Sequence, residues 1–242
     1  IRRQRQMCIR DRDTGIRLEG DAVRSLTVTF LEMWNAVSDK DKNDSDFTGF
    51  LVQTDYQAKQ TGFIQPYADS PMDHEQVGEE VYISMVNKAE KYCWFMTPYL
   101  IITDEMSHAL CLAAKRGVDV RIITPGIPDK KMIYNITRSF YHGLVKHGVR
   151  IYEWTPGFCH AKMSVEDDCM ATCGTINLDY RSLYHHFENG CFMADCQAVL
   201  DIRNDLAATM DECREVTEQY STGRSAYLRL GQLFMRLFAG LL

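Results

Sequence analysis

Long hydrophobic runs are missing from this 242-residue sequence. Although 45% of the residues are hydrophobic, no apolar stretch approaches the roughly 18 residues that a helix needs to cross a bilayer. Internal repeats and low-complexity tracts are also absent. With 25% charged residues, the composition is that of an ordinary folded protein. We therefore expect one large domain, or one domain together with part of a second.

The chain also lacks a CxxC pair, although it holds nine cysteines. Cysteine-based zinc sites usually contain such pairs, so the sequence predicts no metal and no other cofactor. We interpret Cys169, Cys173, Cys191 and Cys196 as small buried apolar residues. Reduced thiols are typical of a domain that faces the cytoplasm.

Basic residues do not outnumber acidic residues either. Lys and Arg number 27 against 33 Asp and Glu, which gives a formal net charge of −6. An acidic chain is a poor general ligand for nucleic acid, so we expect no nucleic-acid partner. Any attraction for phosphate must then be local.

One pattern carries most of the chemical information. His160 and Lys162 are followed by Asp167, by a Gly-Thr-Ile-Asn run at 174–177, and further on by Glu188. The fixed spacing is HxK(x)4D(x)6GTxN. Each piece alone is commonplace on a protein surface, but the joint occurrence at these spacings favours a functional site.

His160 and Lys162 lie in an alternating run, at residues 159–165, that predicts a strand. Residues two apart on a strand share a face, so we expect the imidazole and the ammonium to point into the same space. Ala161 and Met163 would then face the opposite side. Histidine can act as nucleophile or general acid near neutral pH, and lysine supplies a positive charge for phosphate oxygens.

The remaining motif residues fit the same chemistry. Thr175 and Asn177 are neutral donors that we expect, with Lys162, to bind phosphate oxygens. Glu188 begins an apolar run that predicts a neighbouring strand, where a carboxylate could hold one imidazole nitrogen and leave the other for chemistry. Asp167 lies in a Glu-Asp-Asp turn at the end of the histidine strand. We group it with the catalytic residues His160, Lys162 and Glu188.

The pattern resembles the HKD signature of the phospholipase D superfamily. Over about residues 13–242 the chain looks like the C-terminal part of bacterial cardiolipin synthases of the phospholipase D type. The segments that carry this narrower similarity are Gln-Pro-Tyr at 65–67, Thr-Pro-Tyr-Leu at 97–100, residues 113–121, Ile-Pro-Asp-Lys at 127–130, residues 152–158, and Asp-Tyr-Arg-Ser-Leu-Tyr at 179–184.

The resemblance implies a phosphatidyltransferase that joins two phosphatidylglycerol molecules into cardiolipin and releases glycerol. One HKD histidine would form a phosphohistidine without a metal, and the other would protonate the leaving alcohol. In two-lobe relatives the first-lobe histidine is commonly the nucleophile, which would make His160 the general acid/base. Glu188 would orient the imidazole, and Asp167 would act more on local structure than on chemistry. Expected partners are phosphatidylglycerol, other anionic phospholipids and the membrane surface, and the full-length protein is expected in the cell membrane.

The family pattern requires two such histidines, and this chain has one. None of the other six histidines has a lysine two residues on. We therefore expect a fragment that lacks the first HKD lobe and has little activity alone. Its predicted parts are a non-native leader at 1–12, a remnant of the first lobe with a linker at 13–47, the second phospholipase D-like catalytic lobe at 48–222, and an amphipathic tail at 223–242.

The periodicity predicts strands that alternate with helices. This order indicates an α/β fold with helices on both faces of the sheet. The resemblance implies that it is a phospholipase D-like lobe with a mixed β-sheet. Helices are expected at 21–37, 75–91, 103–116, 129–147 and 197–220, and strands at 62–67, 94–98, 118–124, 149–154, 159–165 and 188–195.

The sequence leaves other functions open. The chain could be a phospholipase or another phosphatidyltransferase of the same superfamily. It could be a single-HKD nuclease that completes its site as a dimer, although the acidic charge argues against this. It could also be a non-catalytic lipid-binding lobe, although such a lobe has no need for His160 and Glu188 together.

Overall fold

The computed structural model describes residues 11–38, 46–51, 55–59, 61–73 and 75–221. The predicted tail at 223–242, residues 1–10 of the predicted leader, and residues 39–45 of the predicted remnant and linker therefore lie outside the described residues. The division of the chain into lobes stays a prediction.

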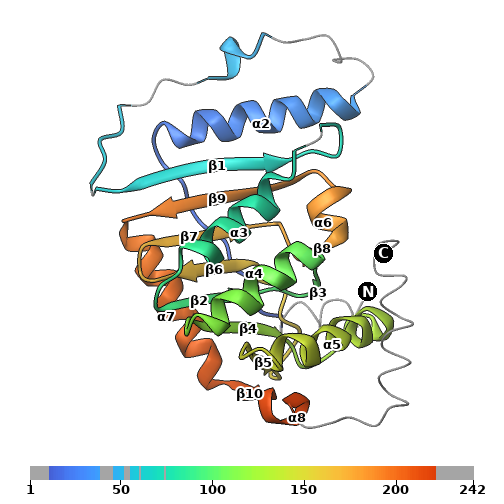
Figure 1. Cartoon of the computed structure of the whole chain (residues 1–242). Coiled ribbons are helices and arrows are strands. Elements are labelled where there is room, and N and C mark those ends of the chain that lie inside the picture. Colours follow the sequence, from blue (N-terminus) through green and yellow to red (C-terminus); the bar gives the residue numbers. More distant parts are fainter. Residues whose placement is uncertain (1–10, 39–45, 52–54, 60, 74, 222–242) are drawn as a thin grey trace.

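The described residues form ten strands. These are β1 (Phe63–Asp69), β2 (Tyr92–Met96), β3 (Leu100–Ile101), β4 (Asp119–Pro125), β5 (Arg150–Trp154), β6 (Met163–Glu166), β7 (Met170–Gly174), β8 (Leu178–Asp179), β9 (Glu188–Ala194) and β10 (Cys213–Glu215). Eight of them form one sheet in the order β1-β9-β7-β6-β2-β4-β5-β10, and β3 pairs with β8 separately (Figure 1).

Helices separate many of these strands along the chain. They are α2 (Ala22–Val37), the short η1 (Thr48–Phe50), α3 (Val77–Lys88), α4 (Asp104–Lys115), α5 (Lys131–Val145), α6 (Tyr180–Tyr184), α7 (Gln197–Asp211) and α8 (Thr217–Ser221). Strand–helix–strand order produces parallel pairs, because a parallel connection needs a crossover. Accordingly β2, β4 and β5 are parallel, whereas β6, β7, β9 and β1 continue the sheet antiparallel.

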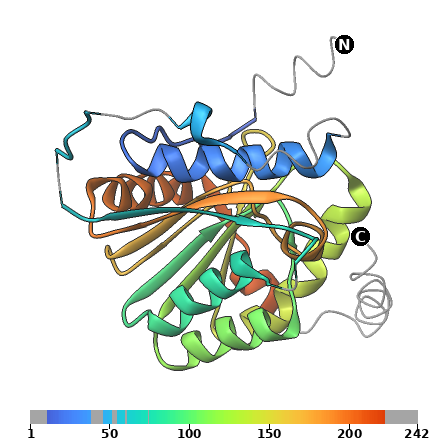
Figure 2. The same cartoon turned by 90° about the horizontal axis from the view of Figure 1, so that it is seen from above.

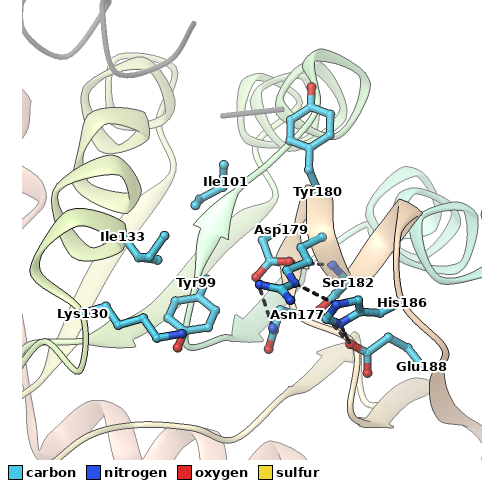
Figure 3. A pocket seen from close by; sticks show the side chains of 11 residues that line it. Tyr99, Ile101, Lys130, Ile133, Asn177, Asp179, Tyr180, Ser182, His186 and Glu188 are labelled. Atoms are coloured by element: carbon cyan, nitrogen blue, oxygen red, sulfur yellow. Dashed lines mark hydrogen bonds and ion pairs between the residues drawn. The ribbon is translucent and has the colours of Figure 1, made fainter. Parts of the chain in front are cut away.

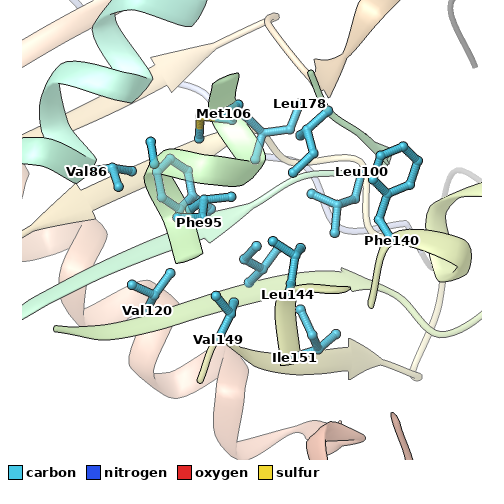
Figure 4. Close-up of a cluster of buried hydrophobic side chains, with 14 of the residues drawn as sticks. Val86, Phe95, Leu100, Met106, Val120, Phe140, Leu144, Val149, Ile151 and Leu178 are labelled. Carbon is cyan, nitrogen blue, oxygen red and sulfur yellow. The ribbon is translucent and has the colours of Figure 1, made fainter. Parts of the chain in front are cut away.

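One hydrophobic core fills the space between the sheet and the helices α3, α4 and α5 (Figure 4). Val86 of α3 and Leu144 of α5 meet Phe95, Val120 and Ile151 of the three parallel strands, and all five are at most 1% exposed. Each fully buried side chain of this size contributes about 1.5–3 kcal/mol relative to an exposed one. This core holds the first layer of helices on the sheet.

A second core lies on the opposite face, beneath α7. Val199 and Leu206 of that helix pack on Met163, Val165 and Met193, which are all at most 2% exposed. Figure 2 shows α2 on the same side of the sheet as α7. The sheet is therefore mixed and covered by helices on both faces, which confirms the predicted fold class.

The helix α2 runs beside β1 (Figures 1 and 2). None of its sixteen residues is buried, and Phe30 and Trp34 are more than half exposed. Among the described residues, no helix has both the length and the hydrophobicity required to cross a membrane.

The predicted single helix at 197–220 is wrong in its second half. The helix α7 ends at Asp211, and β10 and α8 follow. The strand β10 pairs antiparallel with β5, and Arg214 donates to the fully buried Glu153 at 2.6 Å. Pairing with β5 and this ion pair override the local helical preference, because tertiary contacts outweigh propensity. The sequence reading also missed β7, a strand made largely of small residues.

Candidate functional site

His160 lies in a loop that is held by the residues around position 12. The backbone oxygen of Arg12 accepts hydrogen bonds from the amides of His160 and Ala161, at 2.7 and 3.1 Å. Asp13 Oδ2 is 3.1 Å from His160 Nδ1. The imidazole is half exposed, with 47% of its side-chain surface accessible. An imidazole held at Nδ1 presents Nε2 for proton transfer or attack.

Lys162 is buried, in contrast to His160. Its ammonium donates to the backbone oxygen of His160, so the two motif residues contact each other through the main chain. Burial lowers the pKa of Lys162, and the nearby carboxylates of Asp13 and Glu188 oppose this shift. The predicted strand at 159–165 begins only at Met163. The expected alternation fails there, because Ala161 and Lys162 are both buried.

The loop after β7 places Thr175 and Asn177 next to acidic residues. Thr175 Oγ1 donates to Glu188 Oε2. Ser182 Oγ donates to Glu188 Oε1 at 3.0 Å, and Asn177 Nδ2 donates to Asp179 Oδ2 at 3.1 Å. Burial raises the pKa of Asp179. These hydrogen bonds therefore fix the positions of the Thr175 and Asn177 side chains.

Glu188 was expected to hold the imidazole of the HKD histidine. In the structure its carboxylate binds Thr175 and Ser182, and Oε1 lies 3.9 Å from Nδ1 of His186. The residue next to Nδ1 of His160 is Asp13. The partner of His160 in the described residues therefore differs from the predicted one.

Gly174 begins the loop where two strands approach closely. A Cβ added to it would lie 2.3 Å from the backbone oxygen of Asn189 and 2.6 Å from Gly190 Cα. Backbone atoms cannot move aside as a flexible side chain can, so Gly174→Ala must displace the loop or β9.

For Gly174→Ala we expect a loss of about 1–3 kcal/mol in the free energy of unfolding, measured by urea denaturation. Gly143→Ala, on the open face of α5 with no atom within 4 Å of the added Cβ, is the control. Equal stability of the two variants would contradict this prediction.

Asp167 is placed at the turn between β6 and β7, with φ at 48°. Its carboxylate accepts hydrogen bonds from three successive backbone amides: those of Glu90 at 2.6 Å, Lys91 at 3.0 Å and Tyr92 at 2.6 Å. These bonds connect the end of the motif strand to the loop between α3 and β2. The geometry gives Asp167 a role in local structure.

A cavity of about 320 Å³ opens beside the loop (Figure 3). It shares Asn177 and Glu188 with the predicted site, whereas His160, Lys162 and Asp167 are outside its lining. Other polar residues in its wall are Lys130, Tyr99, Asp179, Arg181, Ser182 and His186. Arg181 Nε donates to His186 Nε2 at 2.8 Å.

His186 is outside the HKD pattern, because no lysine follows it two residues later. A signal was nevertheless present, since His186 stands two residues before Glu188 and five after Arg181. Within the described ranges, no group of three or more His, Cys, Asp or Glu side chains is arranged to hold a metal ion.

Comparisons with known proteins identify the family. Residues 82–210, more than half of the chain, match the family model described as cardiolipin synthase, PLD-like domain. An uncharacterized protein of Streptococcus mutans is 46% identical over 231 residues, which cover 96% of this chain and 49% of that protein. A cardiolipin synthase of Halalkalibacterium halodurans is 31% identical over 232 residues, covering 96% of this chain and 45% of that protein. The chain thus spans about half the length of the curated relatives it matches.

Solved structures show the same fold. Nuc, a phospholipase D family member from Salmonella typhimurium, superposes with a TM-score of 0.54 at 16% identity, covering 64% of this chain and 98% of that one. Phosphatidylserine synthase of Haemophilus influenzae gives a TM-score of 0.56 at 16% identity, covering 74% and 47%. The family model matches more than half of the chain, and the fold agrees with that match. The chain belongs to the family of phospholipase D-like domains of cardiolipin synthases.

Proposed function

We propose that this chain supplies one of two histidine–lysine centres in a phosphatidyltransferase that makes cardiolipin from two phosphatidylglycerol molecules. The observation that carries the proposal is a half-exposed imidazole, His160, joined through the main chain to a buried ammonium, Lys162. A buried cation next to an accessible imidazole suits a phosphodiester, whose charge needs stabilising while a proton moves. The relatives named cardiolipin synthase support this choice of substrate.

The proposed reaction has two displacements. A histidine outside this chain attacks the phosphorus of the donor lipid, so a P–N bond forms and the P–O bond to glycerol breaks. His160 gives its proton to the departing glycerol oxygen. It then takes the proton of the acceptor's hydroxyl group, whose oxygen attacks phosphorus and displaces the first histidine. Dividing one substitution into two is the usual gain of covalent catalysis.

Residues of this chain have separate tasks in that scheme. Asp13 holds Nδ1 of His160, which leaves Nε2 to carry the proton. Lys162 and the second N–H of the Asn177 amide stabilise the charge on the phosphate oxygens. The single hydroxyl proton of Thr175 is donated to Glu188, so Thr175 orients that carboxylate. The lipid substrates place the working enzyme at a membrane surface. We propose that the first HKD lobe is the partner that completes the site.

The test compares the chain alone with the chain co-expressed with the N-terminal half of the Streptococcus mutans relative. Vesicles of phosphatidylglycerol are the substrate, and products are separated by mass spectrometry. We expect cardiolipin and equimolar glycerol only when both halves are present. Efficient synthesis by the chain alone would contradict the need for a second centre. Phosphatidic acid as the sole product would identify a phospholipase, and cleavage of added DNA by the chain alone would support a dimeric nuclease.

A further inference from the structure

We propose that the cavity beside the motif loop binds the phosphate-bearing headgroup of the acceptor lipid, with Lys130 and Arg181 as its cationic contacts. The inference rests on the proposed function, because it assigns the second substrate of the same site. Figure 3 shows Lys130 and Tyr99 on one side of the cavity, and Asp179, Ser182, His186 and Glu188 on the other.

The acidic residues of the wall are engaged by neighbouring donors. Asp179 accepts from the amide of Ser182 at 2.8 Å and from Asn177 at 3.1 Å. Glu188 accepts from Thr175 and Ser182. Neutral donors thus satisfy part of the hydrogen-bonding capacity of these carboxylates, and within the described residues neither carboxylate forms an ion pair with Lys130 or Arg181.

The two cations of the wall, in contrast to its carboxylates, keep donors that are available to a ligand. Lys130 is exposed, and no carboxylate within the described part of the chain forms an ion pair with its ammonium. Neighbouring Asp129 accepts instead from the Tyr99 hydroxyl at 2.5 Å and from the Lys130 backbone amide at 2.6 Å. Arg181 uses Nε for His186, which orients a guanidinium that has four further N–H donors. In a chain with a formal net charge of −6, this pair is a local site for an anion.

The apolar part of the wall fits the rest of a glycerol headgroup. Ile101 and Ile133 line the cavity beside the two cations. A volume of about 320 Å³ is within the range of small-molecule sites, which combine apolar walls with a few placed polar groups.

The chemistry of the product explains why a second anion site should lie here. Cardiolipin carries two phosphates joined through one glycerol, so the acceptor's own phosphate stays close to the reacting hydroxyl. Asn177 and Glu188 belong both to the cavity and to the motif, so the two sites share a wall. Binding the acceptor's phosphate would favour a lipid hydroxyl over water. Lys130 and Arg181 are then residues that select the acceptor.

Binding can be measured without catalysis. Glycerol 3-phosphate is titrated into the isotope-labelled full chain, followed by NMR, with inorganic phosphate as a second probe. We expect shifts at Ile101, Ile133 and Ser182, and tighter binding of glycerol 3-phosphate than of phosphate. Lys130→Ala and Arg181→Ala should each weaken binding about tenfold, as loss of a charge-assisted contact does. Lys131→Ala, an adjacent exposed lysine outside the cavity lining, should leave binding unchanged.

Several results would overturn the proposal. These are absence of binding at millimolar concentration, equal binding by Lys130→Ala and the native chain, or shifts confined to Ala161 and Met163. Equal affinity for both probes would mean a free-phosphate site and not a headgroup site. Lys130→Glu reverses a charge at an exposed position, where we expect the fold to be unaffected. Loss of binding in this variant tests the cation site even if Arg181→Ala misfolds.

A second readout separates this inference from the proposed function. With the complementing half present, Arg181→Ala should raise the KM for phosphatidylglycerol and shift products from cardiolipin towards phosphatidic acid. No product from the native pair would refute the proposed function while leaving the binding result intact. A fall in kcat with an unchanged product ratio would refute acceptor selection alone.

Discussion

Replacing His160 with alanine should reduce cardiolipin formation by about 10²- to 10⁴-fold, the contribution of a positioned acid–base group. The loss follows from removing the one imidazole that the motif places next to the buried Lys162. The measurement is the initial rate of cardiolipin release from phosphatidylglycerol vesicles, with the chain paired to its complementing half. Lipid binding should persist, so the change should appear in kcat.

The matched control is His108→Ala, because His108 is an exposed histidine on α4. Its activity should equal that of the native chain. Asp13→Asn should lose less activity than His160→Ala, since an amide oxygen can still accept from Nδ1. A fully active His160→Ala enzyme would exclude His160 from the reaction and turn attention to His186.

The second large effect is expected on stability. Asp167→Asn should lower the free energy of unfolding by about 2 kcal/mol, because charged hydrogen-bond acceptors contribute more than neutral ones. The Asp167 carboxylate accepts hydrogen bonds from the backbone amides of Glu90, Lys91 and Tyr92 at the same time. An amide has one acceptor oxygen and turns its NH₂ group towards the remaining donors. Urea denaturation followed by circular dichroism measures the change.

Asp195→Asn provides the comparison for this variant. Asp195 also has positive φ, 51°, and is exposed. Asparagine tolerates that conformation, so the backbone effect is the same at both positions. The prediction is contradicted if Asp167→Asn lowers the free energy of unfolding no more than Asp195→Asn does. Water would then replace the Asp167 carboxylate as hydrogen-bond acceptor without loss of stability.

The sequence named candidate site residues, whose roles stay predictions, but it did not predict their contacts. The spacing of His160, Lys162 and the 174–177 loop identified residues that the fold brings to one end of the sheet. It could not place Asp13 beside His160, because that contact spans 147 positions and depends on how the N-terminal segment crosses the motif loop. Nor did strand periodicity anticipate that Lys162 would be buried while His160 is not, because the segment is an irregular loop before Met163.

The fold class followed from periodicity, and its missed parts have a common cause. Long apolar patterns such as those of α5 and β4 were located within a few residues. The strands β3, β8 and β10 are two or three residues long, and only pairing with a distant partner makes them strands. Such pairing is a property of the tertiary structure, which a local pattern does not contain.

An open sheet has two outer strands whose backbone groups can recruit another chain, and in the described part of this chain both outer strands carry features that disfavour such pairing. β10 is three residues long and carries the charged Arg214 and Glu215. β1 is longer, but Pro66 removes one N–H from it and α2 runs along it. The exposed helix that contributes nothing to the core therefore has a protective use. Shortened forms that retain β1 without α2 would be expected to form intermolecular sheets.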